Sequence, residues 1–277
     1  MTESITEGRA ERRAQRRIVT PGGNGLDVWA PRIAQAESLS MAALMCRLGH
    51  GFSRDVGSAR LLVVAAHPDD EALGCGRLMH TWSRHRPVSA MVATAGEACV
   101  DHVTARPAGL ADLRLREWDE ALNSLGVGWR RHLELPDGRL AHHERELADQ
   151  LRARLDPGPT HEKPESVVLA APWRHDPHPD HRACGRVAAT VAAERGLPLL
   201  EFPVWMTYWS HPDSIEAADL ALIKLTTDAA ADLAHRRACA AFVSQLDPLS
   251  ENLGPVVPPG MLRHHGQQLL IMPDGSA

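Results

Sequence analysis

The stretch LLVVAAHPDDEALG, from Leu61 to Gly74, joins an apolar run to a histidine, a proline and three consecutive acidic residues. Six apolar residues in a row are typical of a buried strand, and a helical pattern begins at Ala72, just behind the acids. Adjacent carboxylates repel one another unless a cation or a proton compensates them. The stretch therefore predicts a cation site or a proton-transfer site at the end of this strand.

A second motif, PWRHDPHPDHRACG, begins at Pro172, and its segment His178 to His181 opens another helix. Imidazole and carboxylate groups are the ligands that zinc and related divalent ions use, and a catalytic zinc takes three of them. His67, Asp70 and one histidine of the second motif would supply two imidazoles and a carboxylate. Because Asp69 and Asp70 are adjacent, they cannot easily point the same way. We therefore expect Asp70 to be a metal ligand and Asp69 to be the general base.

Each motif alone has a simpler explanation. Two aspartates after a strand are more often a helix N-cap with acids that favour the helix dipole. A lone HxxH pattern is more often a surface feature. Both motifs at the ends of predicted strands favour a metal site. A dinucleotide site is not supported, because after Gly74 and Gly76 the next glycine is Gly96, and no P-loop pattern is present.

Apolar runs that predict strands alternate with stretches that predict helices. This alternation predicts an α/β fold, a Rossmann-like, mostly parallel sheet with helices on both faces, in a single domain. The strands are expected over residues 61–66, 88–96, 132–136, 166–172 and 197–209. The helices are expected over residues 31–49, 72–85, 111–125, 144–155, 181–194 and 218–246. Ligands bind beyond the carboxyl ends of such strands, which is where the two histidine motifs lie.

Composition narrows the class of protein. The chain has 277 residues, 44 % of them hydrophobic, and a net charge of −5. This charge gives no basic surface for nucleic acid, and no apolar run approaches the roughly 18–20 residues of a membrane span. Five scattered cysteines without CxxC spacing argue against disulfides and suit a cytoplasmic protein. The sequence leaves open whether the chain forms a homo-oligomer.

Together, the two histidine motifs resemble those of the PIG-L-like family of zinc-dependent N-acetylglucosaminyl deacetylases, which includes mycothiol-pathway and antibiotic-pathway enzymes. The similarity runs from about Leu61 to Gln245 and includes LRLREWDEALNSLGV, LPDG and RRACAAFVSQLDPL. It implies a Zn2+-dependent hydrolase that removes an N-acyl group, expected to be N-acetyl, from a glucosamine-containing small molecule or glycoconjugate. The deacetylase domain is expected over residues 58–250, between an N-terminal extension, residues 1–57, and an irregular segment, residues 251–277.

Residue by residue, the resemblance implies that His67, Asp70 and His181 bind zinc. Asp69 is then the general base that acts on the zinc-bound water. A protonated His178, its pKa raised by nearby carboxylates, would stabilise the oxyanion and help to protonate the departing amine.

Further residues are expected around this centre. Asp180 would orient an imidazole. Arg114 and Asp137 would, by resemblance, hold sugar hydroxyls, and Glu97 is a further candidate for substrate binding. For Arg114 an equally weighted alternative is an exposed helix arginine that pairs with Glu117.

The chain also departs from the family pattern. Mycothiol-type relatives commonly carry a tyrosine two residues before HPDH, where this chain has Asp176. This difference weakens the transfer of that branch's substrate to this chain. Near the C-terminal end, GQQLLIM replaces an acidic or aromatic pair.

Three other functions stay open at this point. They are an amidase for another amide of a secondary metabolite or thiol conjugate, a non-catalytic binding module on the same fold, and a metal phosphoesterase. The complete set of metal, base and oxyanion residues favours an enzyme over a binding module. A two-metal phosphoesterase needs more ligands than the motifs supply.

Overall fold

The computed structural model describes residues 20–50, 56–102, 104–156, 166–213, 220–248 and 250–272. Within these residues, one sheet of eight strands has the order β1-β7-β8-β6-β5-β2-β3-β4. Neighbouring strands are parallel except that β8 is antiparallel to both β6 and β7. The strands are β1 (Glu37–Leu39), β2 (Arg60–Ala65), β3 (Val88–Val92), β4 (Trp129–His132), β5 (Val167–Pro172), β6 (Leu199–Phe202), β7 (Leu222–Leu225) and β8 (Gln268–Ile271).

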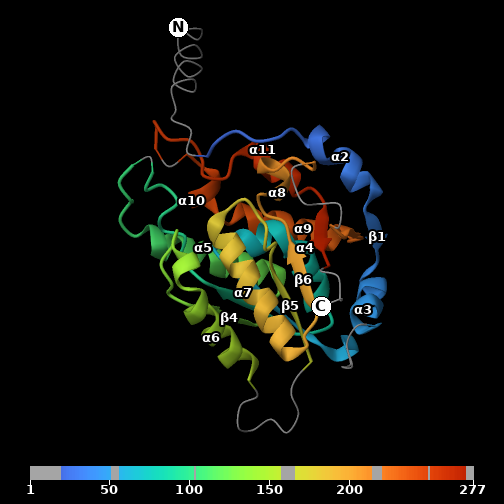
Figure 1. Ribbon diagram of the computed structural model, residues 1–277. Helices are drawn as coiled ribbons and strands as arrows, with labels where there is room; N and C mark the ends of the chain where they lie inside the picture. The colour runs from blue at the N-terminus through green and yellow to red at the C-terminus, as the bar shows by residue number, and fades with distance from the viewer. Residues whose placement is uncertain are drawn as a thin grey trace.

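Helices cover both faces of this sheet, because side chains alternate between the faces along each buried strand. From β2, Leu61 and Val63 pack with apolar residues of α3, α4, α5 and α9, whereas Leu62 and Val64 pack with α6 and α7. In Figure 1, α7 lies over β5, and α2 and α3 lie along one edge with β1 between them. The helices are α2 (Leu26–Gln35), α3 (Met41–His50), α4 (Asp70–Ser83), α5 (Leu110–Leu125), α6 (Glu144–Leu155), α7 (Pro179–Arg195), α8 (Met206–Trp209), α9 (Ala229–Ala240), α10 (Val243–Leu246) and α11 (Pro259–His264).

The predicted fold class is confirmed: a mostly parallel sheet between two layers of helices. None of the described helices has the length and apolar composition needed to cross a membrane. The proposed domain limits, residues 58–250 between two flanking segments, stay a prediction. The structure does place β1, from the N-terminal segment, and β8, from the C-terminal one, inside the sheet.

Several predicted elements were wrong at their ends or in type. The single helix expected over residues 31–49 is in fact α2, β1 and α3. The chain is extended at residues 37–39. Ser40 then caps a new helix, because its Oγ accepts a hydrogen bond from Ala43 N at 3.2 Å. The region 218–246, expected to be helical, contains β7, because its apolar residues pair with both β1 and β8. The irregular C-terminal segment contains α11 and β8 instead.

Three predicted strands were displaced or too long. The strand expected over residues 88–96 is β3, which ends at Val92. The strand expected at residues 132–136 is β4, which ends at His132. The strand expected over 197–209 ends at Phe202, because Pro203 cannot donate to a ladder, and the chain turns into α8.

Candidate active site

The sheet register brings the two histidine motifs together. β2 and β5 are parallel neighbours, with Leu61 opposite Val168, so both strands end at the same edge of the sheet. His67 follows β2 by two residues, and α4 begins at Asp70. Beyond β5, His178 is the N-cap of α7, and Pro179 occupies its first turn. The strand ends therefore deliver both motifs to one point.

Three of the predicted ligand atoms converge there. His67 Nδ1 lies 3.2 Å from His181 Nε2, and Asp70 lies 3.1 Å from His181 Nε2 and 3.6 Å from His67 Nδ1. Zinc–ligand bonds of about 2.0–2.1 Å in a tetrahedral arrangement place ligand atoms roughly 3.3–3.4 Å apart. All three side chains are buried. The donor types and their spacing therefore fit a divalent cation such as zinc.

A second group of donors overlaps this one. Nitrogen atoms of His67, His178 and His181 lie within 4.8 Å of one another. In the set that includes Asp70, both carboxylate oxygens take part: Oδ1 lies 3.1 Å from His181 Nε2 and Oδ2 lies 3.6 Å from His67 Nδ1. Asp70 stays the predicted third ligand, and His178 lines the pocket.

Carboxylates hold the far side of each imidazole. His67 Nε2 lies 3.0 Å from Asp137 Oδ1 and 3.4 Å from Asp180 Oδ2, while His181 Nδ1 lies 3.1 Å from Asp176 Oδ1. Such contacts fix the tautomer and turn the other nitrogen toward the cation. Burial alone would lower the pKa of His181, but Asp70 and Asp176 raise it to about 9. The surroundings of both rings thus favour positive charge at this point.

Asp176 is a site residue that the sequence reasoning did not assign. Its side chain is fully buried and accepts hydrogen bonds from His178 N, Val204 N and Trp205 N besides its contact with His181. The available signal is an acidic residue two positions before HPDH, close enough to turn back toward a histidine of that motif.

Asp69 stands outside the ligand set, as expected of a base. Its φ of 130° lies in a region that residues other than glycine rarely adopt, and its carboxylate lines the pocket. Burial raises the pKa of Asp69 to about 7, while the charge of Arg114 opposes the rise. A carboxyl group with a pKa near neutrality is suited to accept a proton at neutral pH.

His178 differs from its predicted state. Burial lowers the pKa of His178 to about 3, and the neighbouring His181 and His67 add to this effect. The expected raised pKa and protonated ring were therefore wrong. Because His178 Nδ1 accepts from Asp180 N at 3.3 Å, the neutral ring carries its proton on Nε2. The neutral imidazole still offers one donor.

Arg114 is a buried part of the site. It is 2 % exposed, donates to the carbonyl oxygens of Pro68 and Gly96 at 2.7 and 2.5 Å, and lies 3.3 Å from Asp69 Oδ1. The alternative of an exposed arginine paired with Glu117 was wrong.

The remaining predicted site residues differ in whether their side chains line the pocket. Asp137 lines the pocket, but one oxygen contacts His67 and the other accepts from Ala98 N at 2.7 Å. Asp180 accepts from Gly138 N and Leu140 N and faces His67. Glu97 is absent from the described lining of the pocket.

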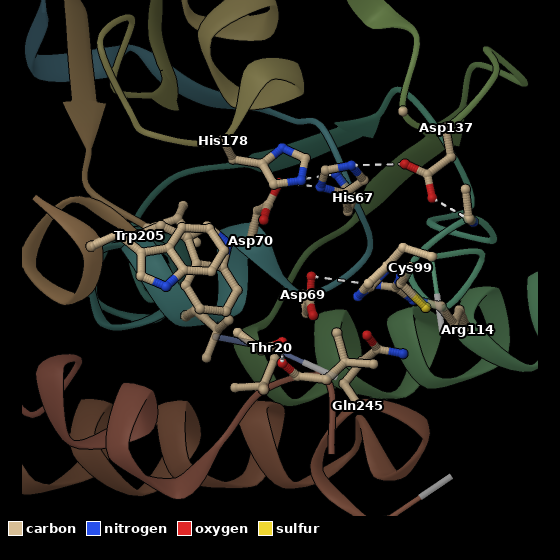
Figure 2. A pocket seen from close by; sticks show the side chains of 18 of the residues that line it. Thr20, His67, Asp69, Asp70, Cys99, Arg114, Asp137, His178, Trp205 and Gln245 are labelled. Atoms are coloured by element: carbon tan, nitrogen blue, oxygen red, sulfur yellow. Dashed lines mark hydrogen bonds and ion pairs between the residues drawn. The ribbon is translucent and has the colours of Figure 1, made fainter. Parts of the chain in front are cut away.

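These residues surround a pocket of about 330 Å³ with two chemically different walls (Figure 2). One wall carries the predicted cation ligands together with Asp69, His178 and Arg114. The other is apolar and includes Trp205 and Trp209, whose rings stack with centroids 4.1 Å apart. Thr20 completes that wall through a hydrogen bond from its hydroxyl to Val256 O.

Comparisons with known proteins give a family and a fold. Residues 62–192 match the family model described as PIG-L, GlcNAc-PI de-N-acetylase. The chain is 34 % identical over 130 residues to the probable N-acetyl-alpha-D-glucosaminyl L-malate deacetylase 2 of Bacillus subtilis strain 168. That match covers 45 % of this chain and 57 % of the relative, so the chain spans little more than half of that protein.

Two solved structures share the fold at low sequence identity. A conserved protein from Thermus thermophilus superposes with a TM-score of 0.52 at 23 % identity, covering 77 % of this chain and 94 % of that one. The zinc-inhibited form of teicoplanin deacetylase Orf2 superposes with a TM-score of 0.54 at 18 % identity, covering 79 % and 100 %. Thr20, Trp205 and Trp209, which belong to the apolar wall of the pocket, lie outside residues 62–192.

Proposed function

Residues 62–192 belong to the PIG-L family, and from this premise we propose that the chain is a zinc-dependent amidohydrolase. It removes an N-acetyl group from a glucosamine-containing small molecule or glycoconjugate. The observation that carries the proposal is a buried carboxylate, Asp69, beside but outside a convergent set of two histidines and one aspartate. The B. subtilis relative, a probable N-acetylglucosaminyl malate deacetylase, supports the amino-sugar substrate.

His67, Asp70 and His181 would hold the zinc ion. When bound, zinc supplies Lewis acidity, which polarises a carbonyl group and makes water more acidic. Asp137, Asp180 and Asp176 keep the two imidazoles in the orientation that this binding needs.

The chain's own groups then divide the proton transfers. Asp69, with its pKa near 7, accepts a proton from the attacking water. His178 donates a hydrogen bond from Nε2 to the oxyanion that develops from the amide carbonyl. Asp69 returns its proton to the departing amine. Arg114 keeps Asp69 in place and favours its ionised form.

The test is a deacylation screen across GlcNAc-containing thiols, glycolipid precursors and antibiotic pseudo-aglycones, read by mass spectrometry. We expect the loss of one acetyl group from at least one class, at a rate about 10²–10⁴-fold lower in the Asp69→Asn variant. Deacylation that proceeds equally in the variant, or in metal-free protein, would exclude the proposed mechanism. Phosphate release from phosphoester probes would favour a phosphoesterase instead.

A further inference from the structure

Gln245 is a buried polar side chain that lines the same pocket and has no role in the mechanism above. It belongs to α10 and is 1 % exposed. Its backbone is fixed on both sides, because Gln245 N donates to Phe242 O at 3.0 Å and Val257 N donates to Gln245 O at 2.8 Å. Like Trp205 and Trp209, it lies outside the matched residues 62–192.

A chain of hydrogen bonds determines which end of the Gln245 amide faces the pocket. Glu117 Oε1 accepts from Ser244 N at 2.8 Å, and Glu117 Oε2 accepts from Ser244 Oγ at 2.6 Å. The single hydroxyl proton of Ser244 is therefore used, and Ser244 Oγ can only accept from its other neighbour. That neighbour is Gln245 Nε2, at 3.0 Å. The amide nitrogen must lie on this side, and the oxygen on the other.

The amide oxygen is then left as an acceptor. Gln245 Oε1 is buried and has no hydrogen-bond partner within the described part of the chain. In Figure 2 the oxygen lies on the side of Asp69, and the nitrogen on the side of Cys99. A buried acceptor without a partner is costly, so a group that supplies a donor at this position gains affinity.

Two other polar groups of the pocket do not offer this acceptor. Arg114 donates to two carbonyl oxygens, and its Nε, which has no partner within the described residues, is a donor and not an acceptor. Each carboxylate oxygen of Asp137 already has a partner. The oriented amide therefore distinguishes a donor on the ligand from an acceptor.

We propose that Gln245 Oε1 accepts a hydrogen bond from one hydroxyl group of the amino-sugar substrate and makes the protein select for that hydroxyl. The inference rests on the proposed function and deepens it by naming a specificity residue. An ether or a deoxygenated carbon at the same sugar position leaves the acceptor unpaired and is rejected.

The test measures binding without turnover. The dissociation constants of methyl N-acetylglucosaminide and of analogues that each lack one hydroxyl are measured by calorimetry on the zinc-loaded Asp69→Asn variant. We expect one analogue to bind about ten- to a hundredfold more weakly than the parent. Adding Gln245→Met, which keeps the length of the side chain but removes the acceptor, should abolish this difference.

Two further variants separate the proposal from a general loss of structure. Ser244→Ala retains Gln245 but frees the amide to rotate, so the preference should shrink. Gln150→Met, at a glutamine outside the pocket lining whose Nε2 donates to Leu133 O, should leave the preference intact. An equal penalty for the same analogue with and without Gln245→Met would overturn the proposal while the proposed function stands. If neither the parent nor any analogue binds to folded protein, the amino-sugar function itself fails, and this inference with it.

Discussion

Arg114 contacts both the carboxylate of Asp69 and the peptide just before it. Its Nη2 atom lies 3.3 Å from Asp69 Oδ1 and donates to Pro68 O at 2.7 Å. Asp69, with its unusual φ of 130°, therefore follows a residue whose carbonyl oxygen accepts a hydrogen bond from Arg114. One guanidinium group supports both the position and the ionisation of the proposed base.

Replacing Arg114 should move the acidic limb of the pH–rate profile. The base is active when ionised, so activity falls as the pH drops through the pKa of Asp69. Arg114 lowers this pKa against the larger effect of burial. In Arg114→Met the pKa should rise by about one to three units, and the acidic limb of kcat/KM with it. Arg116→Met, an exposed arginine on the same helix, is the control. An unmoved limb would show that Arg114 does not act on the base.

Adjacent aspartates should separate metal binding from turnover. Asp69→Asn should retain zinc and lose about 10²–10⁴ in kcat, because a general base is removed. Asp70→Ala should lose zinc affinity first, since it removes one of three ligands. Metal content after dialysis and single-substrate kinetics measure the two effects. Equal metal contents in both variants would mean that the ligand and base are wrongly assigned.

Gly96 should be required for the placement of Arg114. Gly96 has φ +64°, and a Cβ atom there would clash with Arg114 Nη1. Gly96→Ala should therefore displace the guanidinium group and reduce kcat/KM at least tenfold, in addition to the backbone cost of about 1–2 kcal/mol. Gly109→Ala is the matched control, because Gly109 has φ +74° with nothing within 4 Å of an added Cβ. Similar activity in the two variants would contradict this account.

His178→Ala should act on the rate without removing a titration. The variant should retain zinc and lose about 10²–10³ in kcat, as oxyanion donors do. Because burial lowers the pKa of His178 to about 3, the ring is neutral above pH 5. The shape of the profile on the alkaline side should therefore match that of the unmodified protein. If the basic limb of the pH–rate profile disappeared in the variant, His178 would be protonated in the folded protein, as expected from the sequence.

Sequence patterns predicted the parts of this molecule that local chemistry determines. The apolar runs at β2 and β5 gave correct strands, and the run at β3 gave a strand that begins at the predicted residue but ends four residues earlier. The fold class and the family of residues 62–192 are confirmed. The convergence of His67, Asp70 and His181 followed from one rule, that parallel strands end at the same sheet edge. Their roles as ligands, and that of Asp69 as base, stay predictions.

The features missed depend on contacts distant in sequence. β7 and β8 form a strand pair across more than forty residues, and their apolar residues alone suit a helix or a strand. Asp176 orients His181 only because the loop after β5 folds back on α7. The lowered pKa of His178 reflects burial and two nearby imidazoles, which a linear motif does not reveal.

The free energy of unfolding should fall at acidic pH, because buried histidines stay neutral in the folded protein. His235 is 5 % exposed, with Nδ1 3.0 Å from Ala72 O, and burial, aided by the charge of Arg77, lowers its pKa to about 4. In the unfolded chain its pKa is about 6.5. Below that value the unfolded state binds a proton that the folded state does not. The free energy of unfolding should therefore fall by about 1.4 kcal/mol for each pH unit between about 6.5 and 4.

The contribution of His235 can be isolated by substitution. His235→Gln removes the titrating group, so the pH dependence of unfolding should lose about one proton over this window, even though the variant is less stable throughout. His265, whose pKa burial lowers to about 3, should still give a residual slope. Urea unfolding in the presence of a chelator, at several pH values, measures both slopes without a contribution from metal release. Parallel curves for the two proteins would show that His235 does not remain neutral in the folded state.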